Sequence, residues 1–220
     1  PHRLDPADVC SLVEQERIDT ISLVGEAFVR PIADELEAKP YDLTTLRAVL
    51  LAGGATQPHT LERIAAHMPN AVFSDAAGST ETMQVIRTEV PIGVARETGV
   101  FSMLPRARVV DYARSRVLTP GESGTGWLAG AEPLPLGYLG DEAKSAETFR
   151  IIDGERFAVP GDLVELRADG TVMLRGRESM TINTGGEKVF AEEVERAVFT
   201  HPAVLDVMVV GRPSGRWGNE

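Results

Sequence analysis

A short run of small residues ends in a hydroxyl and a carboxylate that could bind a phosphate and a cation. The run is Asp75-Ala76-Ala77-Gly78-Ser79-Thr80-Glu81, and it directly follows an apolar stretch. Gly78 lets a ligand approach the backbone closely. The Thr80 hydroxyl can hydrogen-bond a phosphate oxygen, and the Glu81 carboxylate can hold a hard cation such as Mg²⁺. The run predicts a nucleotide-phosphate site, with an ordinary loop as the alternative.

The elements before this run alternate between helix and strand. The signals are an N-cap and proline at Asp5-Pro6, a strand at 19–24, a helix through 27–36 that is kinked or restarted at Pro31, a strand at 48–51, a helix opened by Gln57-Pro58, and a short strand at 71–73 that leads into a turn at Asp75. Strands joined by helices favour parallel pairing. In such sheets ligands lie beyond the carboxyl ends of the strands, where both Gly53-Gly54 and the Asp75 turn fall.

Beyond about Glu89 the pattern changes to short strands separated by Gly and Pro. Strands are expected at 106–110, 126–129, 163–167 and 172–174, with a hairpin turn at Asp169-Gly170. This pattern is typical of barrel-like or sandwich-like β structure. A helix should then carry Phe190, Val194 and Val198 on one face and end near His201-Pro202, followed by a strand at 203–210.

The predicted fold class is therefore α/β, in three parts. Residues 1–90 form the later part of a large α/β subdomain with a parallel sheet, 91–176 form a β-barrel-like subdomain, and 177–220 start a small α+β C-terminal domain that we expect to be incomplete.

Composition excludes several classes of protein. The 220 residues carry 22 basic and 33 acidic side chains, for a net charge of −11, without a basic cluster, which argues against nucleic-acid binding. The single cysteine, Cys10, excludes an internal disulfide framework and suggests helix packing, and the four histidines lack metal-ligand spacing. No apolar run approaches the roughly 20 residues that span a membrane. We expect a cytoplasmic protein.

Four segments together resemble a known family. They are Leu51-Ala52-Gly53-Gly54-Ala55, the run 75–81, Phe157-Ala158-Val159-Pro160-Gly161-Asp162, and residues 176–195 with the sequence GRESMTINTGGEKVFAEEVE. In this order they resemble the adenylate-forming superfamily of acyl-CoA synthetases, luciferases and peptide-synthetase adenylation domains. The last segment is most similar to the acyl-CoA synthetase, or fatty-acid–CoA ligase, branch. The stretch from Gly126-Trp127 through Gly137-Tyr138 to Thr148-Phe149 also matches.

The resemblance implies a two-step reaction that uses ATP and coenzyme A. A carboxylic acid attacks the α-phosphate of ATP to give an acyl-adenylate, and the thiol of coenzyme A then displaces AMP, so ATP/AMP, Mg²⁺ and coenzyme A are the expected cofactors and co-substrates. Such a reaction needs phosphates to be positioned and neutralised. By family position Thr80 contacts phosphate and Glu81 coordinates magnesium. We assign catalytic roles to these two residues.

The remaining roles are also carried over from the family. They are the adenine border formed by Gly53, Gly54, Ala55 and Asp75, the nucleotide pocket beside Ala76, Ala77, Gly78 and Ser79, the ribose acceptor Asp162, the ribose and phosphate donor Arg177, and the pantetheine channel beside Gly185 and Gly186. From the residues alone, Gly53-Gly54 and Gly185-Gly186 would be plain turns. Asp162 would be a turn residue, and Arg177 a solvated cation.

The chain departs from the family pattern at two positions and lacks two motifs. Ser179 stands at the hinge position, where many relatives carry Asp or Lys, and Ala77 replaces an aromatic residue that stacks on adenine. The small residues there suggest a bulky acyl group. The phosphate-gripping loop and the catalytic lysine are missing, since neither Lys144 nor Lys188 matches, so we expect an internal fragment that is inactive alone. An adenylating enzyme that loads a carrier protein and a nonenzymatic adenylate-binding module are the alternatives.

Overall fold

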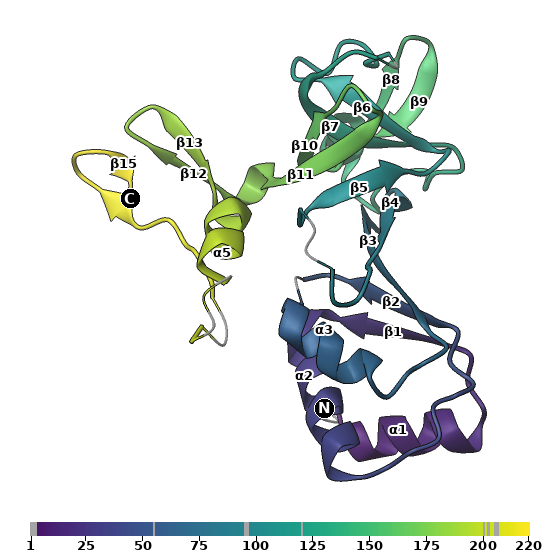
Figure 1. The fold of residues 1–220 in the computed structure, drawn as a ribbon. Coiled ribbons are helices and arrows are strands. Elements are labelled where there is room, and N and C mark those ends of the chain that lie inside the picture. The colour runs from purple at the N-terminus through teal and green to yellow at the C-terminus, as the bar shows by residue number, and fades with distance from the viewer. Residues whose placement is uncertain are drawn as a thin grey trace. The chain divides into compact units, whose positions relative to one another are not determined.

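The computed structural model describes residues 4–54, 56–94, 97–119, 121–199, 201, 203–204 and 207–220. The chain divides into two compact units (Figure 1). The first comprises Pro1–Ala77 and Arg87–Arg96, and the second comprises Gly78–Ile86 and Glu97–Glu220. The division into three domains that is expected from the sequence stays a prediction.

The first unit is an α/β layer whose strands pair in parallel. Its elements are α1 (Pro6–Gln15), β1 (Thr20–Val24), α2 (Gly25–Ala38), β2 (Ala48–Ala52), α3 (Pro58–Ala65) and most of β3 (Val72–Ser79). β1 pairs with β2 and β2 with β3, both in parallel, as the alternation of strands and helices predicted. The Asp5 carboxylate accepts the N–H of Ala7 at 3.0 Å, which confirms the predicted cap. α2 is one helix that contains Pro31 rather than two.

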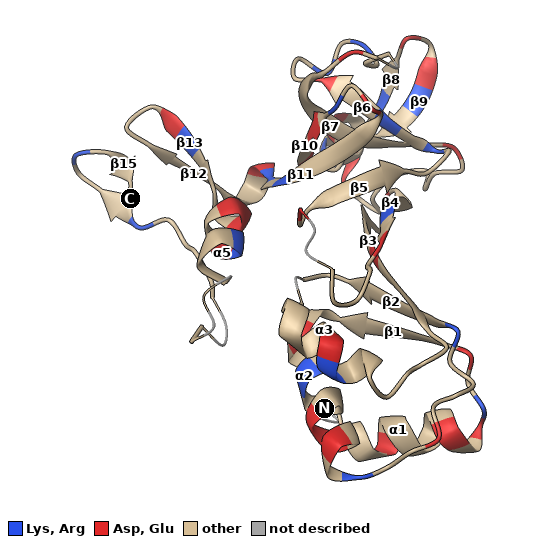
Figure 2. Cartoon of the chain, viewed as in Figure 1, with Lys and Arg blue, Asp and Glu red and all other residues tan. Residues whose placement is uncertain are grey.

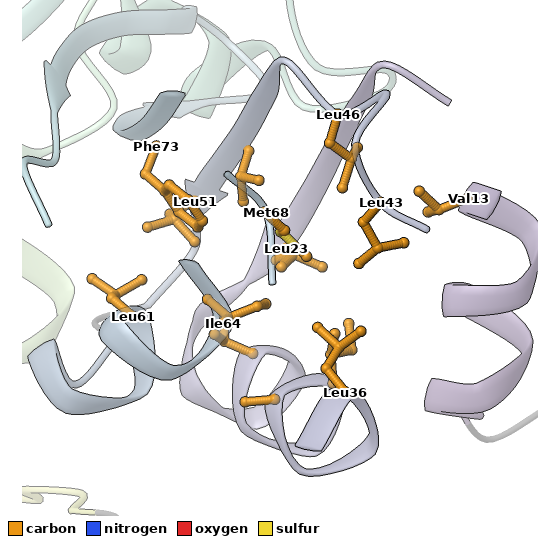
Figure 3. Packing of buried hydrophobic residues seen from close by; sticks show 14 of the residues in the cluster. Val13, Leu23, Leu36, Leu43, Leu46, Leu51, Leu61, Ile64, Met68 and Phe73 are labelled. Atoms are coloured by element: carbon orange, nitrogen blue, oxygen red, sulfur yellow. The ribbon is translucent and has the colours of Figure 1, made fainter. Parts of the chain in front are cut away.

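The three helices bury their apolar faces against the strands (Figure 3). Leu36 of α2 and Ile64 of α3 lie in one cluster with Leu23, Leu51 and Phe73 from the three strands. Burial of such side chains is the main favourable term in folding. The carboxyl ends of the strands are thereby held in one layer.

One buried carboxylate caps a helix within this unit. Glu26 of α2 is 8% exposed, and it accepts the backbone N–H of Gln57 at 2.9 Å and the hydroxyl of Thr60 at 2.8 Å. Gln57 provides no side-chain cap of its own for α3. A negative charge at a helix N-terminus is favourable, so Glu26 connects α2 to the start of α3. Arg30 donates to the same carboxylate at 3.0 Å.

The second unit is built mainly from antiparallel strands. They are β4 (Met83–Glu89), which ends in the first unit, β5 (Val100–Met103), β6 (Ala107–Asp111), β7 (Gly124–Ala131), β8 (Phe149–Ile152), β9 (Glu155–Ala158), β10 (Asp162–Leu166) and β11 (Thr171–Arg177), with α4 (Glu142–Thr148) before β8. The order β5-β11-β10-β7-β9-β8, with β6 also on β7, is open. The described strands thus form the expected β-rich region without closing into a barrel. The Asp169-Gly170 hairpin is confirmed between β10 and β11.

The last part of this unit is small and mixed. A single 3₁₀ turn (Glu178–Met180) precedes β12 (Thr181–Thr184), β13 (Glu187–Phe190), α5 (Ala191–Phe199), β14 (Pro213–Ser214) and β15 (Gly218–Asn219). The strand expected at 203–210 is wrong for the described residues there, which form no strand, while 205 and 206 lie outside the described residues. The N–H of Val209 donates to the Glu195 carboxylate at 2.8 Å, so it is not available for a strand partner.

Candidate functional site

The predicted phosphate turn is shorter than expected. Residues 75–79 belong to β3, where Asp75 pairs with Leu51 of β2, and only residues 80–82 form the turn before β4. Pairing with a neighbouring strand overrides the turn preference of small residues. The small size of Gly78 is nevertheless required, because a Cβ there would lie 1.9 Å from the carbonyl oxygen of Met83.

Two hydroxyls fix the shape of this turn. The backbone N–H of Ser79 donates to the Thr82 hydroxyl at 3.1 Å, and the N–H of Glu81 donates to the Ser79 hydroxyl at 3.2 Å. Thr82 is only 1% exposed. It packs against Gly130, where an added Cβ would lie 2.9 Å from the Cβ of Thr82. Thr80, by contrast, is exposed at the tip. The turn therefore presents Thr80 while its other hydroxyls hold the backbone.

The Glu81 carboxylate is held by a tyrosine from a distant part of the sequence. The Tyr138 hydroxyl donates to Glu81 Oε1 at 2.5 Å. Burial raises the pKa of Glu81, but the hydroxyls of Ser79 and Tyr138 and the charge of Arg177 outweigh it and keep the pKa below its usual value. Glu81 is therefore an ionised acceptor at neutral pH. No local pattern in the sequence predicts this contact, although Gly137-Tyr138 lies in a stretch that resembles the family.

The segment before Tyr138, residues 131–136, is held by two arginines. Arg106 donates to the backbone carbonyls of residues 131, 132 and 133, and Arg156 donates to those of 135 and 136. The side chains of Leu136 and Leu139, on either side of Tyr138, are fully exposed. The Glu132 carboxylate adds an ion pair with Arg156 at 3.0 Å and accepts the N–H of Leu134 at 2.7 Å, so main-chain carbonyls and one acidic side chain together position this segment.

Asp162 and Arg177 form an ion pair at the end of the β10–β11 hairpin. They are opposite each other in the strand register, and Arg177 Nε donates to Asp162 Oδ1 at 2.7 Å. The Asp162 side chain is 10% exposed and that of Arg177 is 50% exposed. Burial and the nearby charge of Glu81 raise the pKa of Asp162, although Arg177 opposes them. The pair presents a buried acceptor beside a half-exposed cation.

A third carboxylate, Glu192 of α5, lies next to this pair. A Cβ on Gly176 would be 2.4 Å from Glu192 Oε2, so glycine is what allows the approach. Burial and the charge of Asp162 raise the pKa of Glu192. Sequence reasoning missed Glu192, because nothing local connects α5 with β10.

The predicted residues of the first unit lie at the end of β2 and within β3. Gly53 has a φ of +70°, and a Cβ on Gly25 would lie 3.3 Å from the Cα of Gly54. These glycines thus allow the backbones of residues 25 and 54 to pack closely, which is a structural role that does not depend on the predicted adenine site. Ala76 and Ala77 continue β3 after Asp75. Ala55 lies outside the described residues.

Gly185 and Gly186 form the turn between β12 and β13. Their φ angles are +58° and +90°, which favour glycine. A Cβ on Gly185 would lie 2.9 Å from the Trp217 ring. Ser179 lies in the 3₁₀ turn after Arg177.

The described residues contain no group of three or more His, Cys, Asp and Glu side chains that could hold a metal ion. Glu81 therefore does not belong to a cluster of that size among them. Mg²⁺ commonly binds one or two protein carboxylates and completes its shell with phosphate oxygens and water, so Glu81 suits a magnesium–nucleotide rather than a bare ion. No described helix has the length and apolarity required to cross a membrane.

Acidic and basic side chains are interspersed on α5 and on the β8–β9 hairpin (Figure 2). The positive charge of Arg177 is balanced by the carboxylates of Asp162, Glu192 and Glu81. With an exposed hydroxyl at Thr80, a fixed carboxylate at Glu81, a buried acceptor at Asp162 and a guanidinium at Arg177, the second unit can bind a ligand that has both hydroxyl donors and an anionic group.

Comparison with known proteins gives consistent results. Residues 1–139 match the family described as AMP-binding enzyme. The chain is 45% identical over 218 residues to the medium-chain acyl-CoA ligase Mig of Mycobacterium avium, and 36% identical over 222 residues to a 3-oxocholest-4-en-26-oate–CoA ligase of Rhodococcus rhodochrous. These alignments cover 99% and 96% of this chain but 39% of each relative.

A solved structure shares the fold. It is the o-succinylbenzoate CoA synthetase of Bacillus subtilis in complex with its acyl-adenylate intermediate, with a TM-score of 0.73 and 25% identity. The alignment covers 99% of this chain and 43% of that chain. The chain therefore spans well under half the length of the relatives it matches.

Proposed function

The chain belongs to the AMP-binding enzyme family, and on that premise we propose that it is part of an acyl-CoA ligase. The enzyme would activate a carboxylic acid with ATP to an acyl-adenylate and then form a thioester with coenzyme A. The names of the relatives that are 36% to 45% identical support this activity.

One observation carries the proposal, the Asp162–Arg177 pair in the same unit as the Thr80–Glu81 turn. A buried carboxylate has two acceptor oxygens, which suits the two hydroxyls of a ribose. Arg177 is half exposed and can reach a phosphate while still paired with Asp162. Thr80 would donate its exposed hydroxyl to a phosphate oxygen. These roles match what nucleotide activation requires, because the protein mainly has to orient and neutralise phosphates.

Glu81 would hold a magnesium ion that is bound to the nucleotide. When bound, such an ion neutralises phosphate charge. The low pKa of Glu81 supports this role, because only the ionised carboxylate is a ligand. Two further assignments rest on the family resemblance. Coenzyme A would pass beside Gly185 and Gly186. The adenine would lie beside Gly53, Gly54, Ala55 and Asp75, and the nucleotide pocket would also include Ala76, Ala77, Gly78 and Ser79.

A bulky or medium-length acyl group is the substrate class that we propose. One relative is named for a medium-chain acid and another for a steroid acid. Ala76 and Ala77 are small side chains in β3, which would leave room for such an acyl group, whereas the space at Gly78 is taken by the Met83 carbonyl. Thioester formation across straight, branched and ring-bearing acids would test this, and a preference for acetate and propionate would contradict it.

The activity itself can be tested with the full-length protein by measuring its two half-reactions separately. Acid-dependent release of pyrophosphate from ATP measures the first half-reaction, and thioester formation with coenzyme A measures the second. Nucleotide binding without pyrophosphate release would instead identify a nonenzymatic adenylate-binding protein. Pyrophosphate release without a coenzyme A thioester would point to a carrier protein as the acceptor.

A further inference from the structure

Tyr138 occupies one oxygen of the Glu81 carboxylate. Its hydroxyl donates to Oε1 at 2.5 Å, and both side chains are partly buried. The two residues are 57 positions apart, so this contact is a product of the fold. The Ser79 hydroxyl also favours the ionised carboxylate. Because the phenol occupies Oε1, we assign the other oxygen, Oε2, to the cation.

The phenol has little freedom to move away. The N–H of Tyr138 donates to the Ser145 hydroxyl at 2.8 Å, and its ring lies 5.8 Å from that of Phe149, centroid to centroid. The Lys144 ammonium lies 5.1 Å from the Tyr138 ring centroid. Arginines hold the preceding backbone as well, so the hydroxyl approaches Glu81 from a fixed direction.

The number of oxygens that a carboxylate offers affects which cation it prefers. Mg²⁺ requires near-ideal octahedral geometry and typically takes single carboxylate oxygens together with phosphates and water. Ca²⁺ is larger, accepts six to eight oxygens, and often binds both oxygens of one carboxylate. A donor fixed on Oε1 opposes two-oxygen binding by Glu81.

We propose that Tyr138 is a positioning residue that restricts Glu81 to one-oxygen coordination and so makes the site select Mg²⁺ over Ca²⁺. The proposal rests on the proposed function for the identity of the ligand, a nucleotide-bound cation. It goes beyond that function by assigning the choice of cation to a residue that does not itself bind the metal.

Tyr138→Phe tests the proposal, because it removes the hydroxyl and keeps the ring. In the full-length protein we expect the Mg²⁺ concentration for half-maximal pyrophosphate release to rise about 10-fold, as is usual when a partner of a metal ligand is lost. The ratio of Mg²⁺- to Ca²⁺-supported rates should fall by at least the same factor.

A matched control exists in the first unit. Tyr41 donates to Glu35 Oε1, also at 2.5 Å, so Tyr41→Phe removes the same kind of bond away from the site. It should change neither the Mg²⁺ dependence nor the ratio of the two rates. If Tyr138→Phe lowers the yield of folded protein, Ser145→Ala provides a second variant, because it removes the acceptor of the Tyr138 N–H and should shift the same ratio less strongly.

Binding gives a readout that is independent of turnover. Mn²⁺ titrations followed by electron paramagnetic resonance, with a non-hydrolysable ATP analogue present, measure cation affinity directly, and competition with Mg²⁺ and Ca²⁺ gives the selectivity. Loss of selectivity in Tyr138→Phe supports the proposal even if the wild-type protein forms no thioester. Unchanged selectivity in Tyr138→Phe, or a wild-type protein that does not distinguish Mg²⁺ from Ca²⁺, would overturn it.

Discussion

Replacing Asp162 by Asn should separate nucleotide binding from stability. Asn keeps an oxygen that can accept from Arg177 Nε, now 2.7 Å from Asp162 Oδ1, but it carries no charge. Hydrogen bonds to charged groups contribute about 1.5–3 kcal/mol, so losing the charged ribose acceptor should weaken ATP or AMP binding by about 10- to 150-fold.

The thermal stability of Asp162→Asn should not fall together with its affinity for the nucleotide. Burial raises the pKa of Asp162, so the folded state disfavours the ionised form. The stability that this group contributes is therefore present below the ordinary Asp pKa and is lost as the pH rises through the raised value. At pH 7 the charged, buried Asp162 is a cost, and Asp162→Asn should leave the unfolding midpoint of the ligand-free protein unchanged or raise it. The difference should shrink at pH 3, where Asp162 is protonated.

Calorimetric titration with AMP and thermal unfolding at both pH values would measure the two effects. Glu165→Gln is the control, because Glu165 lies on the same strand and also pairs with an arginine of β11, Arg175, but its side chain is 37% exposed. We expect no loss of affinity there. Asp162→Asn with unchanged AMP affinity and a midpoint lowered by several degrees would refute the reasoning, because Asp162 would then be a structural residue.

Three further outcomes follow from the structure. Gly78→Ala should destabilise the protein by about 1–3 kcal/mol or more in urea unfolding, because the new Cβ would meet the Met83 carbonyl, whereas Gly215→Ala, which has open space around it, should not. Glu26→Gln should lower the free energy of unfolding by about 1–3 kcal/mol, since a buried charge-assisted cap is lost; an unchanged value would contradict the capping role. Burial raises the pKa of Cys10 to about 11, so peptide mass spectrometry should find it unmodified by iodoacetamide at pH 8 until the protein unfolds.

Local signals predicted the elements well where neighbouring residues decide the structure. The Asp5 cap and the Asp169-Gly170 hairpin depend on residues within a few positions, and both are confirmed. Residues 75–79 were predicted as a turn, but β3, which pairs with β2 as far as Asp75 and lies next to β4 in the sheet, runs through them to Ser79. The strand expected at 203–210 does not form in the described residues, because a side chain of α5 uses the backbone of Val209.

Contacts between distant residues explain what the sequence could not show at the site. Family motifs pointed to Asp162 and Arg177, and the structure pairs them across the β10–β11 hairpin. Tyr138 and Glu192 had no such assignment, because their relation to Glu81 and Asp162 depends on how the strands and α5 pack. The functional roles of these residues stay predictions until variants are measured.

The way residues 131–136 are held has a consequence for how this surface can evolve. Arg106 and Arg156 bind main-chain carbonyls there, which every amino acid provides, and Glu132 is the side chain of the segment that adds an ion pair to Arg156, so the path of the segment does not depend on the leucines beside Tyr138. Mutations at the outward-facing Leu136 and Leu139 can accumulate without displacing the phenol between them. Related proteins can therefore diverge on this outer surface while the inner contact to Glu81 is inherited unchanged.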